Sequence, residues 1–179
     1  MTKSDSGYTD RCRAEFLHRS YTAVDGLWFV MVEDAHGFDR ALELDREVWA
    51  VMPKIQARRA RELLELHGDA PVDLARCIGL KFSADSQNAE ISHDAHGVRV
   101  RLTACMWLDA MRRSGREHLA SRVGEVICNT EFGVWAREFG GRYEVSIPRR
   151  LCDGCGCCEI VFALCHTNAE EKDEGGATR

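Results

Sequence analysis

Residues 88–104 read NAEISHDAHGVRVRLTA, and this stretch decides the fold class. Apolar and polar residues alternate on both sides of the turn-forming residues 94–97, as they do in two strands joined by a hairpin. The same alternation returns at 142–147 and at 157–164. The second half of the chain therefore contains strands that can pair into a mostly antiparallel sheet.

Amphipathic helices are indicated in the segments around these strands, because apolar residues recur there at three- and four-residue steps. Gly37 should separate the first helix from the second, and Pro53 should kink or break the second. We expect the apolar stripes of both N-terminal helices, with Trp28, Val48 and Ile55 among them, to face the core. The helical segments are 9–35, 38–66, 71–82, 106–113 and 117–139.

Together these elements predict an α+β fold, in which N-terminal helices pack with a mostly antiparallel sheet and one long helix. The chain has 179 residues and is 45% hydrophobic and 30% charged, which is typical of one globular domain with a real core. We place this domain at 1–168, with a helical part at 9–84 and the strands and long helix at 88–165. The polar residues 169–179 are expected to be disordered.

Charge and hydropathy argue against several classes of partner. A formal net charge of −5 argues against a nucleic-acid or anionic-membrane surface as the main partner. No apolar run approaches the roughly 20 residues that span a membrane. The first residues lack the basic-then-apolar pattern of a signal peptide, so we expect a cytoplasmic protein. Its expected partner is a small-molecule substrate or ligand, and a homo-oligomer is compatible with that role.

Cysteine usage is the most informative chemical feature of the chain. Nine cysteines are present, and residues 152–158 read CDGCGCC, which places four thiols in one short loop. In a reducing cytoplasm these cysteines are poor material for stable disulfides. Thiolates at such spacing suit zinc, copper(I), an iron–sulfur cluster or a redox-active dithiol, and the spacing alone does not choose among them.

The stretch from Cys105 to Phe162 resembles the family of L-2-amino-thiazoline-4-carboxylic acid hydrolases. The resemblance rests on Cys105, on the Cys-x-x-acid motif Cys128-Asn129-Thr130-Glu131, and on Gly154-Cys155-Gly156-Cys157-Cys158-Glu159. The N-terminal segment around Trp28 and Trp49 resembles a related group of uncharacterised bacterial proteins. Both groups are similar in outline to 4-vinyl-reductase-type small-molecule-binding domains. The resemblance implies a hydrolase that opens or cleaves a C–N or C–S bond in a small compound such as a cyclic amidine or thiazoline.

The resemblance and the helical spacing together indicate a site. Cys128 and Glu131 lie one helical turn apart, so their side chains share a face. There the thiol can act as nucleophile or metal ligand and the carboxylate can move protons, with Cys105 as a third catalytic candidate. Among these cysteines, one ends a strand, one lies on the long helix and the others precede the last strand. We therefore expect a metal site, with zinc favoured over an iron–sulfur cluster, formed by Cys105, Cys128, Cys155 and Cys158.

Two other functions are compatible with the same residues. One is a non-catalytic sensor, in which thiolates hold zinc and a pocket between helix and sheet holds a small apolar molecule. The other is a closed metal site that ties the last strand to the long helix without catalysis. We expect a pocket that has the sheet as its floor and the helices around Trp28 and Cys128 along one side.

Overall fold

The structure is a computed structural model and describes residues 7–165. Within these residues it confirms the α+β class, since helices, one of them the long α6, combine with an antiparallel sheet of four strands. The tail 169–179, predicted to be disordered, lies outside the described residues. The helices are α1 (Asp10–His36), α2 (Phe38–Trp49), α3 (Met52–Leu63), α4 (Pro71–Ala84), α5 (Met106–Arg113) and α6 (Ala120–Glu138). The strands are β1 (Ala89–Asp94), β2 (Gly97–Leu102), β3 (Tyr143–Arg149) and β4 (Cys158–Leu164), and the short 3-10 turns are η1 (Glu117–Leu119) and η2 (Leu151–Asp153).

The sheet has the strand order β1-β2-β4-β3, and each neighbouring pair is antiparallel. The predicted hairpin is confirmed, with Asp94 paired to Gly97 across a tight turn. Glycine is required at position 97, because φ is +146° and a Cβ there would collide with the carbonyl oxygen of Phe162. The last strand, β4, pairs with both β2 and β3, so it lies inside the sheet and brings Cys158 to the sheet's end.

The strand indicated by the alternation at 142–147 is longer in the structure, where β3 continues through Pro148 to Arg149. β3 is an edge strand, where the missing N–H of proline need not interrupt a ladder of hydrogen bonds. The register with β4 shifts between Ser146 and Arg149, which accommodates the proline. The strand therefore extends as far as the Cys-rich loop.

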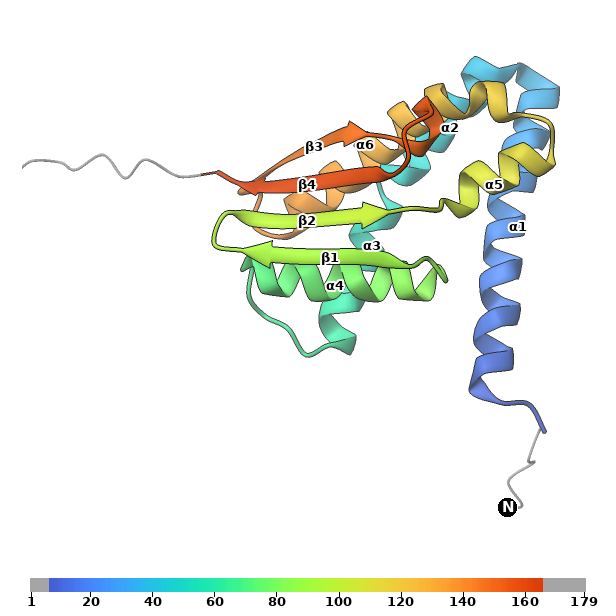
Figure 1. Cartoon of the computed structure of the whole chain (residues 1–179). Helices are drawn as coiled ribbons and strands as arrows, with labels where there is room; N and C mark the ends of the chain where they lie inside the picture. The colour runs from blue at the N-terminus through green and yellow to red at the C-terminus, as the bar shows by residue number, and fades with distance from the viewer. Residues whose placement is uncertain (1–6, 166–179) are drawn as a thin grey trace, which may run out of the picture.

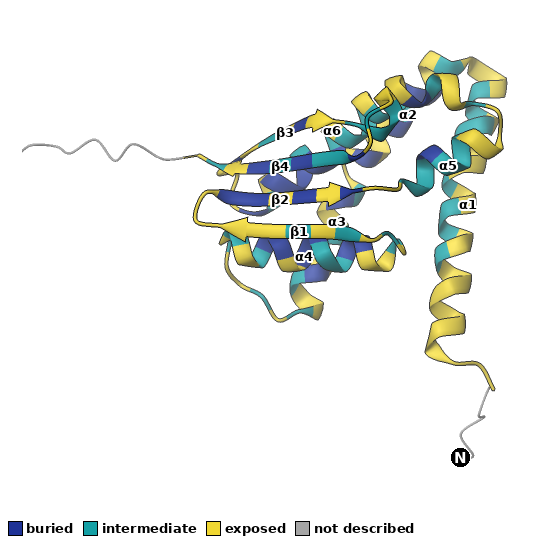
Figure 2. Ribbon diagram, in the orientation of Figure 1, coloured by how far each residue is buried: buried dark blue, intermediate teal, exposed yellow. Residues whose placement is uncertain are grey.

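The core lies between the sheet and the helices on one of its faces. α4 and α6 pack against that face, and α3 packs on both helices (Figure 1). Buried residues of the sheet and of these helices form one core there, and Figure 2 shows buried positions on both layers. The ring centroid of Phe132 on α6 is 6.2 Å from that of Phe82 on α4 and 6.1 Å from that of Phe162 on β4. This packing fixes α4 and α6 relative to each other, and both helices carry residues of the site.

The interruption predicted at Pro53 is confirmed. α2 ends at Trp49 and α3 begins at Met52, which places Pro53 in the first turn of α3, where its missing N–H is not needed. Two residues expected to point inward do not, since Val48 is 45% exposed and Ile55 is 57% exposed. Each of these helices buries a narrower face than its apolar stripe suggests.

α1 differs most from the expectation. It ends at Gly37 as predicted, where φ is +85°, but none of its residues Asp10–His36 is buried. The helix projects past the end of the sheet (Figures 1 and 2). The apolar stripe that was expected to face the core faces outward, and Trp28 is 46% exposed. α1 meets the rest of the chain through its other face, where the ring centroid of Phe29 is 5.9 Å from that of Phe38.

Candidate functional site

Thiols from four separate parts of the fold come together beside α6. Cys128 lies on α6, Cys105 directly precedes α5, Cys152 lies in η2 and Cys158 begins β4. Burial is the main reason that the pKa of Cys128 is raised, and the charges of Glu131, Cys105, Cys158 and Cys152 raise it further. Such charge effects place these groups in the same region of the fold. The structure thus brings together three of the predicted site cysteines and adds Cys152.

The environment of these cysteines favours the protonated thiol. Burial raises the pKa of Cys128 far above its usual range, and burial raises the pKa of Cys152 to about 11. Burial also raises the pKa of Cys158, and the backbone N–H of Leu151, which donates to the sulfur at 3.2 Å, partly offsets that rise. At neutral pH these side chains are therefore thiols, which need a base or a metal ion to become nucleophiles or ligands.

The Cys-rich loop is fixed to α6 by direct contacts. The sulfur of Cys152 lies over Gly124, one turn before Cys128, and a Cβ on Gly124 would be 2.7 Å from it. Glycine at this position therefore leaves the space that the thiol occupies. Two side-chain hydrogen bonds add to this contact, from Ser121 to Asp153 at 2.6 Å and from Arg150 to Asn129 at 2.8 Å.

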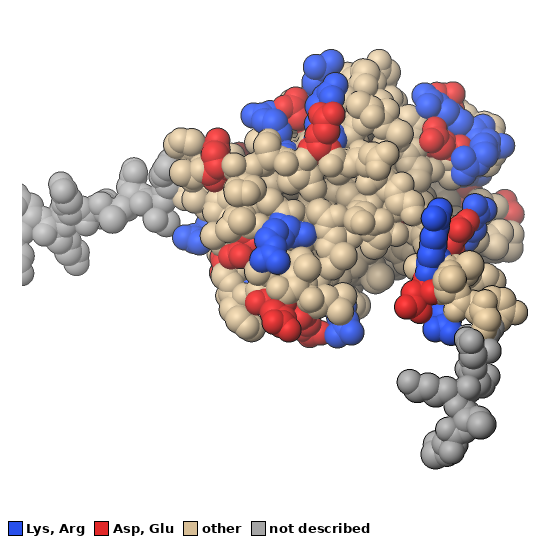
Figure 3. All heavy atoms as spheres, turned by 60° about the horizontal axis from the view of Figure 1, so that its bottom comes forward, with Lys and Arg blue, Asp and Glu red and all other residues tan. Residues whose placement is uncertain are grey.

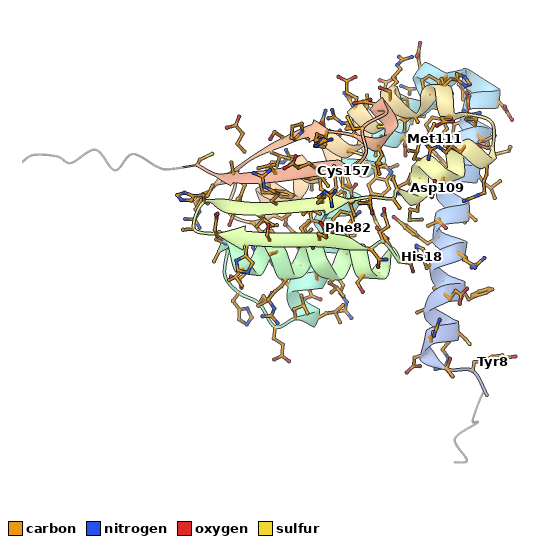
Figure 4. The ribbon with its side chains drawn as sticks, in the orientation of Figure 1. Tyr8, His18, Phe82, Asp109, Met111 and Cys157 are labelled. Atoms are coloured by element: carbon orange, nitrogen blue, oxygen red, sulfur yellow. The ribbon has the colours of Figure 1, made fainter. Side chains whose placement is uncertain are left out.

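The other two thiols of the loop are Cys155, predicted as a metal ligand, and Cys157. Cys155 is half-buried, whereas Cys157 is buried at the end of the sheet that faces α5 (Figure 4). Among residues 7–165, no group of three His, Cys, Asp or Glu side chains is arranged to hold a metal ion. In this arrangement the thiols are neighbours without forming a coordination shell, so zinc binding stays a prediction.

A buried ion pair adjoins the thiols. Lys81 on α4 places its Nζ 2.9 Å from Oε1 of Glu131 and 3.1 Å from Oδ2 of Asp85. Lys81 and Glu131 are only 8% and 6% exposed. Burial alone would lower the pKa of Lys81, but the charges of Glu131 and Asp85 outweigh it and raise the pKa. Lys81 is therefore a permanent ammonium held against the carboxylate that lies one turn from Cys128.

Sequence reasoning identified Glu131 but missed Lys81. Glu131 on α6 lies far along the chain from Lys81, and no rule of residue spacing connects these two residues. A weak signal was present, because Lys81 falls on the apolar face that Leu74 and Ile78 form in α4. A lysine at a core-facing position needs a buried acidic partner. That signal predicts a buried pair but not which acid completes it.

Polar side chains of α1 and α2 extend this group. Burial raises the pKa of Tyr21 to about 12, and the charges of Asp25, Asp85 and Glu131 add to that rise, so the phenol lies close to the ion pair. Burial and the charge of Asp25 raise the pKa of Asp45 to about 7, partly offset by a hydrogen bond with the Trp49 side chain. We name the groups Tyr21, Asp25, Asp45, Lys81 and Glu131 the polar network, because the charges of Asp25 and Glu131 act on Tyr21 and the charge of Asp25 acts on Asp45.

His18 lies one turn before Tyr21, on the side of α1 nearest the sheet (Figure 4). Its Nε2 is buried and has no hydrogen-bond partner among the described residues. The polar network therefore lies beneath α1, whereas the helix's apolar side chains point away from it.

Two cavities of the described residues lie away from the thiols. One cavity, of about 410 Å³, lies between the end of α4 and β1 and is lined in part by Phe82, Gln87 and Arg101. Another, of about 490 Å³, lies at Arg61 and His67. Neither is the pocket expected between the Trp28 helix and the long helix. The thiols Cys105, Cys128, Cys152 and Cys158 are half-buried, so they are partly open to solvent in this conformation.

Comparison with known proteins gives a family and no activity. The model of a family of unknown function, DUF6125, matches residues 15–153. The chain belongs to this family. The DUF6125 match contains Lys81, Cys105, Cys128 and Glu131, and it ends before Cys155. No curated protein and no solved structure matches the chain. Within residues 7–165 we find no helix with the length and apolar character of a membrane span.

Proposed function

We propose that this protein is a hydrolase that uses Cys128 to open or cleave a C–N or C–S bond in a small sulfur- or nitrogen-containing compound. One observation carries the proposal: the buried Lys81–Glu131 ion pair, 2.9 Å between Nζ and Oε1, adjoins the Cys128 thiol. A thiol with a carboxylate one helical turn away, itself paired with an ammonium, supplies the groups that covalent hydrolysis requires. The resemblance to amino-thiazoline hydrolases points to the same reaction class.

Cys128 is the nucleophile and Glu131 is the base. Because the pKa of Cys128 is raised, the thiol must lose its proton as it attacks, and Glu131 is the carboxylate whose charge it senses most strongly. The sulfur forms a bond to the electrophilic carbon while the proton passes to Glu131. Glu131 then gives the proton to the leaving nitrogen or sulfur as that bond breaks, which leaves the carbon bound to Cys128.

A water molecule completes the cycle. It attacks the same carbon, Glu131 takes one of its protons, and that proton returns to the sulfur as the bond to Cys128 breaks. Lys81 holds Glu131 in position through both steps and balances its charge in a site with little water. Lys81 is thus a positioning residue, and Cys128 and Glu131 are the reacting groups.

Cys128 is half-buried, so movement of a neighbouring element would widen the access of a substrate to it. α1 is suited to that movement, since none of its residues Asp10–His36 is buried and Gly37 joins it to α2. Tyr21 and Asp25 lie on the α1 side of the network, where a substrate passing between α1 and α6 would meet them first. Their polar groups suit a substrate that carries an amine or amidine.

The experiment compares hydrolysis of a panel of thiazolines, cyclic amidines and small amides. Cys128→Ser should lose activity by orders of magnitude, because the hydroxyl ionises far less readily than the thiol. Cys77→Ser is the matched control, since Cys77 is fully buried in the core and lies outside the network. Full activity in a folded Cys128→Ser variant, checked by circular dichroism, would refute the proposal.

A metal-binding sensor is the second candidate, favoured by the mutual proximity of Cys105, Cys128, Cys152 and Cys158. It predicts about one equivalent of zinc in anaerobically purified protein, lost in Cys105→Ser. Less than about a tenth of an equivalent of any transition metal would exclude this candidate and leave the thiol hydrolase in place.

A further inference from the structure

The outer face of α1 carries an apolar stripe that nothing in the described chain covers. We name these six residues the outer stripe, and each is between 46% and 71% exposed: Phe16, Leu17, Val24, Leu27, Trp28 and Met31. Leu17, Val24 and Met31 are seven residues apart, and Leu27 lies between the last two. Such spacing is typical of a helix that pairs with another helix along a narrow seam.

The outer stripe is not needed for contacts with the rest of the same chain. α1 contacts its own body through the opposite face, where Phe29 packs on Phe38 and Glu33 pairs with Arg116. A helix of 27 residues that buries none of them is poorly stabilised by its own body. Because α1 projects past the sheet, a second helix can lie along the outer stripe without meeting the sheet (Figure 1).

The apolar area of the outer stripe is large enough for a stable interface. If each of its side chains exposes on the order of 100 Å², the stripe covers roughly 600 Å², the upper end for patches on monomeric proteins. Two such stripes together would bury roughly 1,200 Å², which reaches the lower limit of specific interfaces.

The difference in net charge between the two parts of α1 favours an antiparallel pairing. Arg11, Arg13 and Arg19 lie in its first ten residues together with Asp10 and Glu15, which leaves a net charge of +1 there, and no Lys or Arg follows before its end at His36. Asp25, Glu33 and Asp34 lie in the second part. Charges of both signs are visible on this helix beside its uncharged side chains, near the grey N-terminal residues in Figure 3. An antiparallel partner brings the part with a net charge of +1 on one helix to the part with a net charge of −3 on the other.

We infer that the protein is a homodimer in which α1 packs antiparallel against α1 of a second copy, through the outer stripe, with the crossing near Val24. Val24 is the midpoint between Leu17 and Met31. In this arrangement Leu17 of each copy lies near Met31 of the other. The opposite face of α1 continues to cover the polar network of its own chain.

Mass measurement by light scattering during gel filtration of the full chain tests the dimer. One chain has a mass of 20.2 kDa, so the dimer has twice that mass. At about 50 µM, above the micromolar dissociation constants of weak interfaces of this size, wild type should be dimeric. Val24→Glu places a charge in the middle of the stripe and should give a monomer with unchanged helical circular dichroism.

Ile55→Glu is the matched control, because Ile55 is 57% exposed on α3 and lies outside the outer stripe. This variant should stay dimeric. A monomeric wild type would overturn the inference and indicate that the stripe meets a different protein or folds back on its own body. A dimer that persists in Val24→Glu would show that another surface forms it.

Cysteine cross-linking tests the direction, in a background where the exposed Cys12 and Cys165 are changed to serine. Val24→Cys should form a disulfide-linked dimer with itself. Leu17→Cys and Met31→Cys should cross-link when mixed and not separately. Self-cross-linking at all three positions would establish a parallel pair and overturn the antiparallel arrangement.

Discussion

Lys81 of α4 and Glu131 of α6 form a buried ion pair, with 2.9 Å between Nζ and Oε1, although 50 positions separate them in the chain. The core holds the two helices together, since Phe82 and Phe132, each the next residue along, pack with ring centroids 6.2 Å apart. The same packing thus sets the geometry of the pair and its position beside Cys128.

Removing one member of this pair should destabilise the protein strongly. Lys81→Met leaves the Glu131 charge buried without its partner, and we expect the free energy of unfolding to fall by about 3–5 kcal/mol. Adding Glu131→Gln should restore part of the loss, because of the two carboxylates that pair with Lys81 only Asp85 then keeps its charge. Denaturant unfolding measures both changes.

The control for that prediction is Arg59→Met, which breaks a pair with Glu62 whose side chains are 65% and 63% exposed. We expect a change below about 1 kcal/mol, since solvent screens exposed pairs. Equal losses in Lys81→Met and Arg59→Met would contradict the buried-pair interpretation.

Gly124→Ala should loosen the Cys-rich loop from α6. Its Cβ would lie 2.7 Å from the sulfur of Cys152, so the loop must shift. We expect a cost of about 1–3 kcal/mol from overpacking, which exceeds the gain in helix propensity, and faster alkylation of Cys152. Gly133→Ala on the same helix would contact Arg137 at an ordinary 3.6 Å and should stabilise the protein by about 0.5–1 kcal/mol. Stabilisation by both variants would argue against the contact.

Asp45 should make stability fall as the pH rises. Burial raises its pKa from 3.8 to about 7 in the folded protein, so between these values the folded state holds a proton that the unfolded state has lost. The stabilising contribution is complete below pH 3.8 and is lost as the pH rises through about 7. Its size is at most about 4 kcal/mol.

Asp45→Asn should remove this fall in the free energy of unfolding with rising pH. The variant therefore gains stability relative to wild type as the pH rises from 5 to 8. Asp34→Asn changes an exposed acid on α1 and serves as the control. Urea unfolding at several pH values measures the effect. If the free energy of unfolding of Asp45→Asn falls with pH as steeply as that of wild type, another group controls the pH dependence.

Local patterns predicted the elements of this fold well. The turn at 94–97, the helix end at Gly37 and the break at Pro53 each follow from the backbone preferences of one or two residues, and all three are present. The outward direction of α1 could not be predicted in the same way. Periodicity shows that Trp28 and its neighbours form a stripe, but not whether that stripe meets the core or another molecule.

The site was predictable only where it is local in sequence. Cys128 and Glu131 share a helical face because they are one turn apart, whereas Lys81 and Tyr21 join them through the packing of α4 and α1. Cys155 was the loop thiol predicted for the site, whereas in the structure the charge of Cys152 acts on Cys128. Gly124 leaves the space that the sulfur of Cys152 occupies. Residue spacing predicts neither the approach of Lys81 and Tyr21 to Glu131 nor the position of Cys152.

The most direct test of the central claim, that Glu131 is the base for Cys128, is the rate at which iodoacetamide alkylates Cys128 at pH 7, followed by peptide mass spectrometry. The charge of Glu131 raises the pKa of Cys128, so charge alone predicts faster alkylation in Glu131→Gln. A general base predicts the opposite, a rate roughly 10²-fold lower than in wild type. A folded Glu131→Gln variant whose Cys128 reacts as fast as wild type, or faster, would contradict the account.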